Sequence, residues 1–152
     1  MPKEQIRIHT AAVGGDFGGK GSPMDIPLCI ELSRRTGQAV RLHRTYDEEL
    51  IAGDPAASMV CTIRMGVSND GLIQAVSSRA LFNAGAYGGF TPGPGSGTVV
   101  GSSYRLPAAE MESVRVYTNE VPTGNMRAPG APQAAFAWES MMDLVARGIG
   151  LD

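Results

Sequence analysis

Two segments in which apolar and polar side chains alternate dominate the pattern of the chain. They cover residues 58–67 and residues 72–82, and the residues between them include Asn69-Asp70-Gly71. Asp-Gly is typical of a tight turn because glycine adopts positive φ without steric cost. Alternation with period two places one set of side chains on each face of a strand. The sequence therefore predicts a long β-hairpin.

Three other segments show weaker alternation or short apolar runs. Residues 6–13 carry apolar side chains at Ile6, Ile8 and Val13, and residues 39–43 and 111–118 are shorter segments of similar composition. We expect each of these segments to form a strand.

Helical spacing appears in three places. The first helix begins at Asp25, a good N-cap, and ends at Thr36, before the C-terminal cap Gly37. Residues 46–52 predict one or two helical turns, and residues 133–148 place apolar side chains on one helical face. With the strands, these helices predict an α+β fold with a mixed, mainly antiparallel sheet, a long hairpin, and two main helices packed on it.

The composition narrows the classes of protein. The 152 residues fit a single domain, 1–152, and 43% are apolar, so the chain can bury a core. The formal net charge of -2 argues against a nucleic-acid surface, and no apolar run is long enough to span a membrane. The initial MPKEQIRIH lacks the apolar region of a secretory signal, so we expect a cytoplasmic protein.

Glycine and proline are unusually frequent and unevenly placed. The chain has 20 Gly and 10 Pro, concentrated in residues 14–21, 85–101 and 124–132. Glycine suits places where main chain approaches a ligand closely or adopts positive φ. These three stretches predict a surface built largely from main chain.

The first glycine-rich loop is compatible with several interpretations. Gly14 to Lys20 matches the spacing G-x-x-x-x-G-K of a phosphate-binding loop, but Gly21 replaces the Ser or Thr that binds Mg²⁺. The dinucleotide fingerprint G-x-G-x-x-G is absent after Gly19. A tight turn without a ligand is the remaining simple interpretation, although five glycines around Phe17 exceed what a turn requires.

A resemblance to a known family covers nearly the whole chain. The loop Gly14-Gly15-Asp16-Phe17-Gly18-Gly19-Lys20 resembles the Gly-Gly-x-Phe-Gly-Gly-Lys loop of the molybdenum hydroxylases, the family of xanthine oxidase and aldehyde oxidoreductase. Asn125-Met126-Arg127-Ala128-Pro129-Gly130-Ala131-Pro132-Gln133 is similar to that family's second cofactor loop. Residues 36–42 and 83–87 are similar to the segments that flank the family's hairpin. The chain is thus identified as resembling the first molybdopterin-binding domain of the family's large subunit.

The resemblance implies a set of cofactor contacts. Phe17 would shield the metal centre and Gly18 would offer an amide, while Met126 and Arg127 would supply the second loop. The implied cofactor is molybdenum-molybdopterin in its cytosine dinucleotide form, with the metal held by pterin sulfurs and by no protein side chain. Asp16 stands where the family often has glycine, and charge repulsion predicts that its carboxylate points away from an anionic ligand.

The resemblance also implies a function. It points to hydroxylation of an aldehyde or an aromatic N-heterocycle with oxygen from water. Gly21 and Pro129 replace a glutamate and an aromatic residue of purine-oxidising members, and Ala128 replaces the cysteine of carbon monoxide-oxidising members. The catalytic base of the family lies outside this chain, so no catalytic residue is expected here.

Partners follow from the same resemblance. We expect residues 1–152 to be a fragment of a larger molybdopterin-binding subunit, inactive alone, that works with a small iron–sulfur subunit carrying 2Fe-2S clusters and a flavin subunit carrying FAD. Two alternatives remain open from the residues: a cofactor-free module for binding or scaffolding, and a nucleotide phosphate-binding domain.

Overall fold

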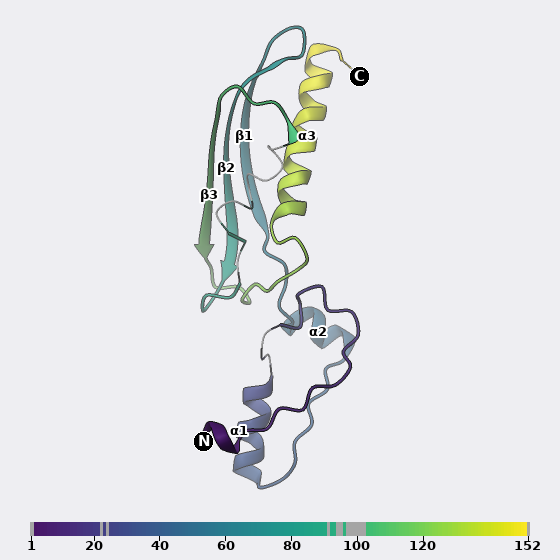
Figure 1. Cartoon of the computed structure of the whole chain (residues 1–152), viewed down its shortest axis with the longest axis vertical. Coiled ribbons are helices and arrows are strands. Elements are labelled where there is room, and N and C mark those ends of the chain that lie inside the picture. Colours follow the sequence, from purple (N-terminus) through teal and green to yellow (C-terminus); the bar gives the residue numbers. More distant parts are fainter. Residues whose placement is uncertain are drawn as a thin grey trace.

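A computed structural model describes residues 2–21, 23, 25–90, 92–93, 96 and 103–151. The element order is η1, α1, α2, β1, β2, β3 and α3. Figure 1 shows α3 alongside the sheet, whereas α1 and α2 lie beyond one end of it. The predicted α+β class is confirmed.

The sheet is built on the predicted hairpin. Among the described residues it has three strands, β1 (Met59–Val67), β2 (Ile73–Gly85) and β3 (Ala109–Tyr117), in the order β1-β2-β3. β1 and β2 pair antiparallel, but β2 and β3 pair parallel. The sheet is therefore mixed, although only one of its two pairings is antiparallel, because the chain after β2 returns along the sheet before β3 begins.

The core lies between one face of the sheet and α3 (Ala131–Ile149). The register pairs Met59 with Phe82 and Cys61 with Ala80, so these side chains share a face. α3 packs against β1, and Phe82 and Trp138 are completely buried. Burying a side chain of this size contributes roughly 1.5–3 kcal/mol relative to leaving it exposed. Residues 39–43, in contrast, contribute no such buried side chain.

The two N-terminal helices differ in how they begin. α1 (Ile26–Thr36) follows Asp25, but the Asp25 side chain makes no capping hydrogen bond and pairs with Arg44 instead, so the predicted N-cap is wrong. Its C-cap Gly37 has a left-handed φ of 64°, as the sequence predicted. α2 (Tyr46–Ala52) begins with a capping box in which Thr45 and Glu48 bond each other's backbone N–H. A short 3₁₀ turn, η1 (Lys3–Gln5), precedes them.

One arginine connects the two helices. Arg44 Nη2 lies 2.5 Å from Asp25 Oδ2, and Arg44 Nη1 donates to the carbonyl of Ala52 at 2.9 Å. The Arg44 side chain is only 16% exposed. This residue therefore ties the start of α1 to the end of α2.

Two strand predictions are wrong, and one packing prediction needs correction. Residues 6–13 and 39–43 are irregular, and Ile8 is 82% exposed. A strand needs a neighbouring strand for its backbone hydrogen bonds, and the described part of the chain offers these segments none. Only α3 of the two main helices packs on the sheet, since α1 has no buried residue.

Within the described ranges, no helix combines the length and apolar character needed to cross a bilayer. Part of the glycine-rich stretch 85–101 lies outside the described residues.

Candidate cofactor-binding site

The first glycine-rich loop is a tight turn that is closed by the side chain of Asp16. Asp16 accepts hydrogen bonds from the Gly18 amide at 3.0 Å and the Lys20 amide at 2.8 Å, one on each carboxylate oxygen. Its carbonyl accepts a third from the Gly19 amide at 2.8 Å. Phe17 and Gly18 both have positive φ, 51° and 97°. The carboxylate thus folds back onto the loop that carries it.

The second loop is also strained. Ala128 has a φ of 59°, and Gly130 has a φ of 84° immediately before α3. A Cβ on Gly130 would lie 2.6 Å from the Cβ of Ser96, so only glycine fits this turn. Backbone strain of this kind costs of order 1–3 kcal/mol and concentrates at binding sites.

The two loops meet in space. Arg127 Cζ lies 5.9 Å from the centroid of the Phe17 ring, within the range of a cation–π contact. A Cβ on Gly18 would lie 2.9 Å from the Cβ of Asn125, so the two backbones approach as closely as glycine permits. The structure therefore brings together all four residues that the sequence singled out, since Met126 lies between Asn125 and Arg127.

A small cavity lies beside this contact. It has a volume of about 130 Å³ and is lined mainly by the second loop, including Met126, Arg127 and Gln133. Sites for complete small-molecule ligands typically measure roughly 300–1,000 Å³. This cavity can hold only part of a cofactor-sized molecule.

The hydrogen bonding of the site is incomplete. Asn125 Oδ1 and Gln133 Oε1 are buried and have no hydrogen-bond partner within the described residues. No carboxylate in the part of the chain that the structure describes forms an ion pair with Arg127. Arg127, which has no ion-pair partner among the described residues, lines the same cavity as Gln133, whose Oε1 is a buried acceptor. This pair fits a ligand that carries both an anionic group and N–H donors, as a phosphorylated pterin does.

Protein side chains were considered as metal ligands as well. Among the described residues, no group of three or more His, Cys, Asp or Glu could hold a metal ion.

The geometry does not favour a phosphate-binding loop of the nucleotide type. Lys20 Nζ donates to the carbonyl of Gly14 at 3.2 Å, so the lysine folds back on its own loop. α1 begins at Ile26 and not directly after the loop, so the amides of its first turn do not continue from the loop.

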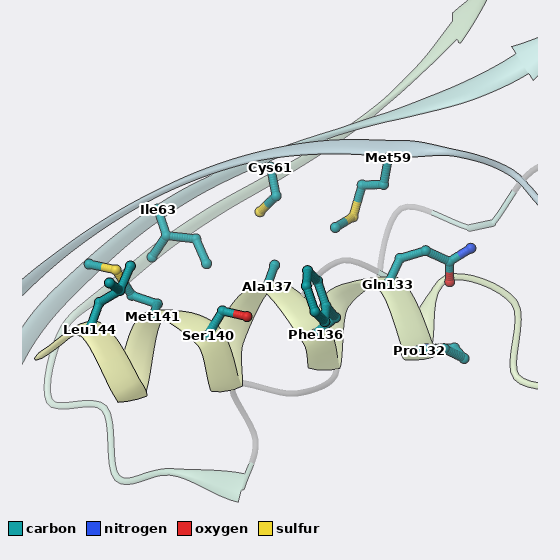
Figure 2. A pocket seen from close by; sticks show the side chains of 10 residues that line it. All are labelled: Met59, Cys61, Ile63, Pro132, Gln133, Phe136, Ala137, Ser140, Met141 and Leu144. Atoms are coloured by element: carbon teal, nitrogen blue, oxygen red, sulfur yellow. The ribbon is translucent and has the colours of Figure 1, made fainter. Parts of the chain in front are cut away.

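A second, wider groove adjoins the small cavity, with which it shares Pro132 and Gln133 of the second loop. It runs between β1 and α3, where Met59, Cys61 and Ile63 face Phe136 and Met141 across an apolar gap (Figure 2). Burial raises the pKa of the Cys61 thiol, which keeps it protonated.

Comparison with known proteins identifies the family. The family sequence model of the molybdopterin cofactor-binding domain matches residues 1–152 of this chain. The xanthine dehydrogenase molybdenum-binding subunit of Escherichia coli is 32% identical over all of this chain and 21% of its own length. The nicotinate dehydrogenase large molybdopterin subunit of Eubacterium barkeri is 29% identical over all of this chain and 36% of its own. The chain thus spans between about a fifth and about a third of these relatives.

Comparison with solved structures gives a result consistent with the sequence comparison. The aldehyde oxidoreductase of Desulfovibrio gigas superposes with a TM-score of 0.73 and 28% identity over 91% of this chain and 16% of its own. The CO dehydrogenase of Oligotropha carboxidovorans gives a TM-score of 0.80 over 99% of this chain and 20% of its own, and at 23% identity it supports the fold alone. The chain belongs to the molybdopterin cofactor-binding domain family, whose members here are parts of molybdenum-containing oxidoreductases.

Two features of hydrogen bonding at the site were not predicted from the sequence. It did not foresee that Asp16 would use the Gly18 amide, nor that Asn125 and Gln133 would keep buried, unpartnered oxygens. A signal for the first existed, because Asp two residues before Gly is typical of a side-chain-capped turn. No local pattern reports the second.

Proposed function

We propose that this chain forms part of the molybdenum-cofactor site of an oxidoreductase that hydroxylates an aldehyde or an aromatic N-heterocycle with oxygen from water. The observation that carries the proposal is the approach of Arg127 to Phe17, because it joins two loops that are remote in sequence. Membership of the molybdopterin-binding family supports the cofactor class.

Each of the four residues has a role in this proposal. The Arg127 guanidinium pairs with an anionic group of the cofactor, and its planar donors suit a phosphate better than a lysine would. Phe17 forms an apolar wall that excludes water beside the metal. Met126 contributes backbone next to Arg127. Gly18 permits the close approach of Asn125, and its amide is a further donor when it is free.

The bound cofactor supplies a molybdenum centre able to transfer oxygen and accept electrons. This chain's contribution is to bind, orient and shield. The general base lies outside these residues, so we assign no catalytic residue to the chain.

Relatives support the substrate class and the assembly. Their names include a nicotinate dehydrogenase, an aldehyde oxidoreductase and a quinoline 2-oxidoreductase, which act on N-heterocycles or aldehydes. We extend this to the present protein, together with the cytosine dinucleotide form of the cofactor. We also propose three partners: the remainder of a large subunit, a small iron–sulfur subunit carrying 2Fe-2S clusters, and a flavin subunit carrying FAD.

Molybdenum analysis tests the proposal. The longer subunit, made in a host that synthesises molybdopterin, is expected to contain molybdenum, and Arg127→Met is expected to lose most of it. Arg147→Met is the matched control, because Arg147 is 77% exposed on α3. A subunit without molybdenum would favour the scaffold alternative, and equal losses in both variants would remove Arg127 from the site.

A further inference from the structure

The first loop holds an anion of its own, the carboxylate of Asp16. Its two oxygens accept the Gly18 amide at 3.0 Å and the Lys20 amide at 2.8 Å. Successive backbone N–H groups that converge in a turn form an anion-binding concavity. In this chain the carboxylate of Asp16 itself occupies the concavity.

The same hydrogen bonds fix Phe17, which lies inside the turn that they close. Phe17 has a φ of 51°, a conformation that bulky residues avoid. Phe17 is also 60% exposed, so packing alone does not hold it there. The Gly18 and Lys20 amides, by donating to Asp16, close the turn around Phe17, whose ring centroid lies 5.9 Å from Arg127 Cζ.

We propose that Asp16 is an internal occupant of this anion site, which positions Phe17 toward Arg127 in the free protein and which a phosphate-bearing ligand must displace to reach the Gly18 amide. The ligand class rests on the proposed function, but the occupancy rests only on the geometry of the loop. Asp16 is a positioning residue, since it acts through Phe17 and through access to Gly18.

Displacement reduces the apparent affinity for an anion. A ligand that binds only the fraction of molecules with a free site has its apparent affinity reduced by that fraction. Removing the carboxylate should therefore raise anion affinity at Gly18 and Lys20, and it should also release Phe17 from its position against Arg127.

An NMR titration of the 152-residue chain with inorganic pyrophosphate tests this proposal. We expect the Gly18 and Lys20 amides of Asp16→Gly to shift with an affinity about fivefold or more above that of the unaltered chain. Asp16→Asn keeps one acceptor oxygen and should be intermediate. The nuclear Overhauser contact between Phe17 and Arg127 should weaken in Asp16→Gly.

A control variant separates the effect of freeing the anion site from the effect of removing one negative charge. Asp143→Asn makes the same change of charge on an exposed part of α3, 73% exposed at its side chain, and should leave the titration unchanged. The proposal is overturned if Asp16→Asn and Asp16→Gly bind equally tightly, if the unaltered chain binds as tightly as Asp16→Gly, or if no variant binds. Failure of the cofactor proposal would appear separately, as missing molybdenum in the longer subunit.

Discussion

The guanidinium of Arg127 lies over the ring of Phe17, with Cζ 5.9 Å from the ring centroid. The two residues come from loops near opposite ends of the chain, and neither loop belongs to a helix or strand. Through this contact, the N-terminal segment and the segment before α3 form one surface. Each loop has left-handed backbone at a residue other than glycine, Phe17 in the first and Ala128 in the second.

Replacing Phe17 should harm cofactor binding more than stability. The ring is 60% exposed, so Phe17→Ala removes little buried surface and should change the free energy of unfolding by less than about 1 kcal/mol. We expect a clear loss of molybdenum in the longer subunit. Urea denaturation and metal analysis of the same preparation check this. Equal damage to both quantities would mean that Phe17 is ordinary core.

Gly18 should not accept a side chain. In Gly18→Ala the new Cβ would lie 2.9 Å from Asn125 Cβ at a φ of 97°, which costs of order 1–3 kcal/mol locally. We expect the contact between Phe17 and Arg127 to be lost, measured by nuclear Overhauser effects. Gly14→Ala is the control in the same loop, because its Cβ meets no atom within 4 Å. Equal effects of the two changes would contradict the close approach of the loops.

Tyr104 should make stability fall at alkaline pH. Its hydroxyl donates to the Glu139 carboxylate at 2.6 and 2.8 Å, and this bond, with burial and the carboxylate charge, raises the pKa of Tyr104. A raised pKa in the folded state stabilises the protein below the usual tyrosine pKa of about 10, and this contribution disappears as pH rises through the raised value. Thermal unfolding of Tyr104→Phe should therefore depend less on pH in the alkaline range. The exposed Tyr46→Phe should behave like the unaltered protein.

Phe82 should dominate the core. It is fully buried on β2, and Phe82→Ala should lower the free energy of unfolding by about 3–5 kcal/mol. Val60→Ala on the neighbouring strand is the control, since Val60 is 67% exposed, and it should cost less than about 1 kcal/mol. Chemical denaturation measures both. Similar costs would place the core on the other face of the sheet.

Local elements could be predicted from the sequence because their signals are local. The hairpin follows from alternation and the Asp70-Gly71 turn, and the end of α1 follows from Gly37. These patterns specify backbone conformation within a few residues of themselves. Capping and alternation do not depend on distant parts of the chain.

The failures share one cause, which is dependence on a distant partner. Residues 6–13 have the alternation of a strand, but alternation supplies no neighbouring strand to bond with. The parallel pairing of β3 could not be predicted from its sequence either, because the pattern within one strand does not specify the direction of its neighbour.

The candidate site was found through resemblance and not through pattern. Nothing local to Phe17 indicates that it lies near Arg127, although both loops are rich in glycine and proline. The use of the Gly18 amide by Asp16 was within reach of sequence reasoning, since an Asx turn is a local feature.

The parallel alignment of β3 with β2 has a kinetic consequence. The hairpin can close early, because its strands adjoin in sequence, but parallel pairing requires the start of β3 to reach the start of β2, which lies more than thirty residues earlier in the chain. Pairings between remote residues raise the contact order and slow the search for the native topology. The last strand to dock should therefore set the refolding rate, leaving the open edge of β2 exposed to self-association until it arrives.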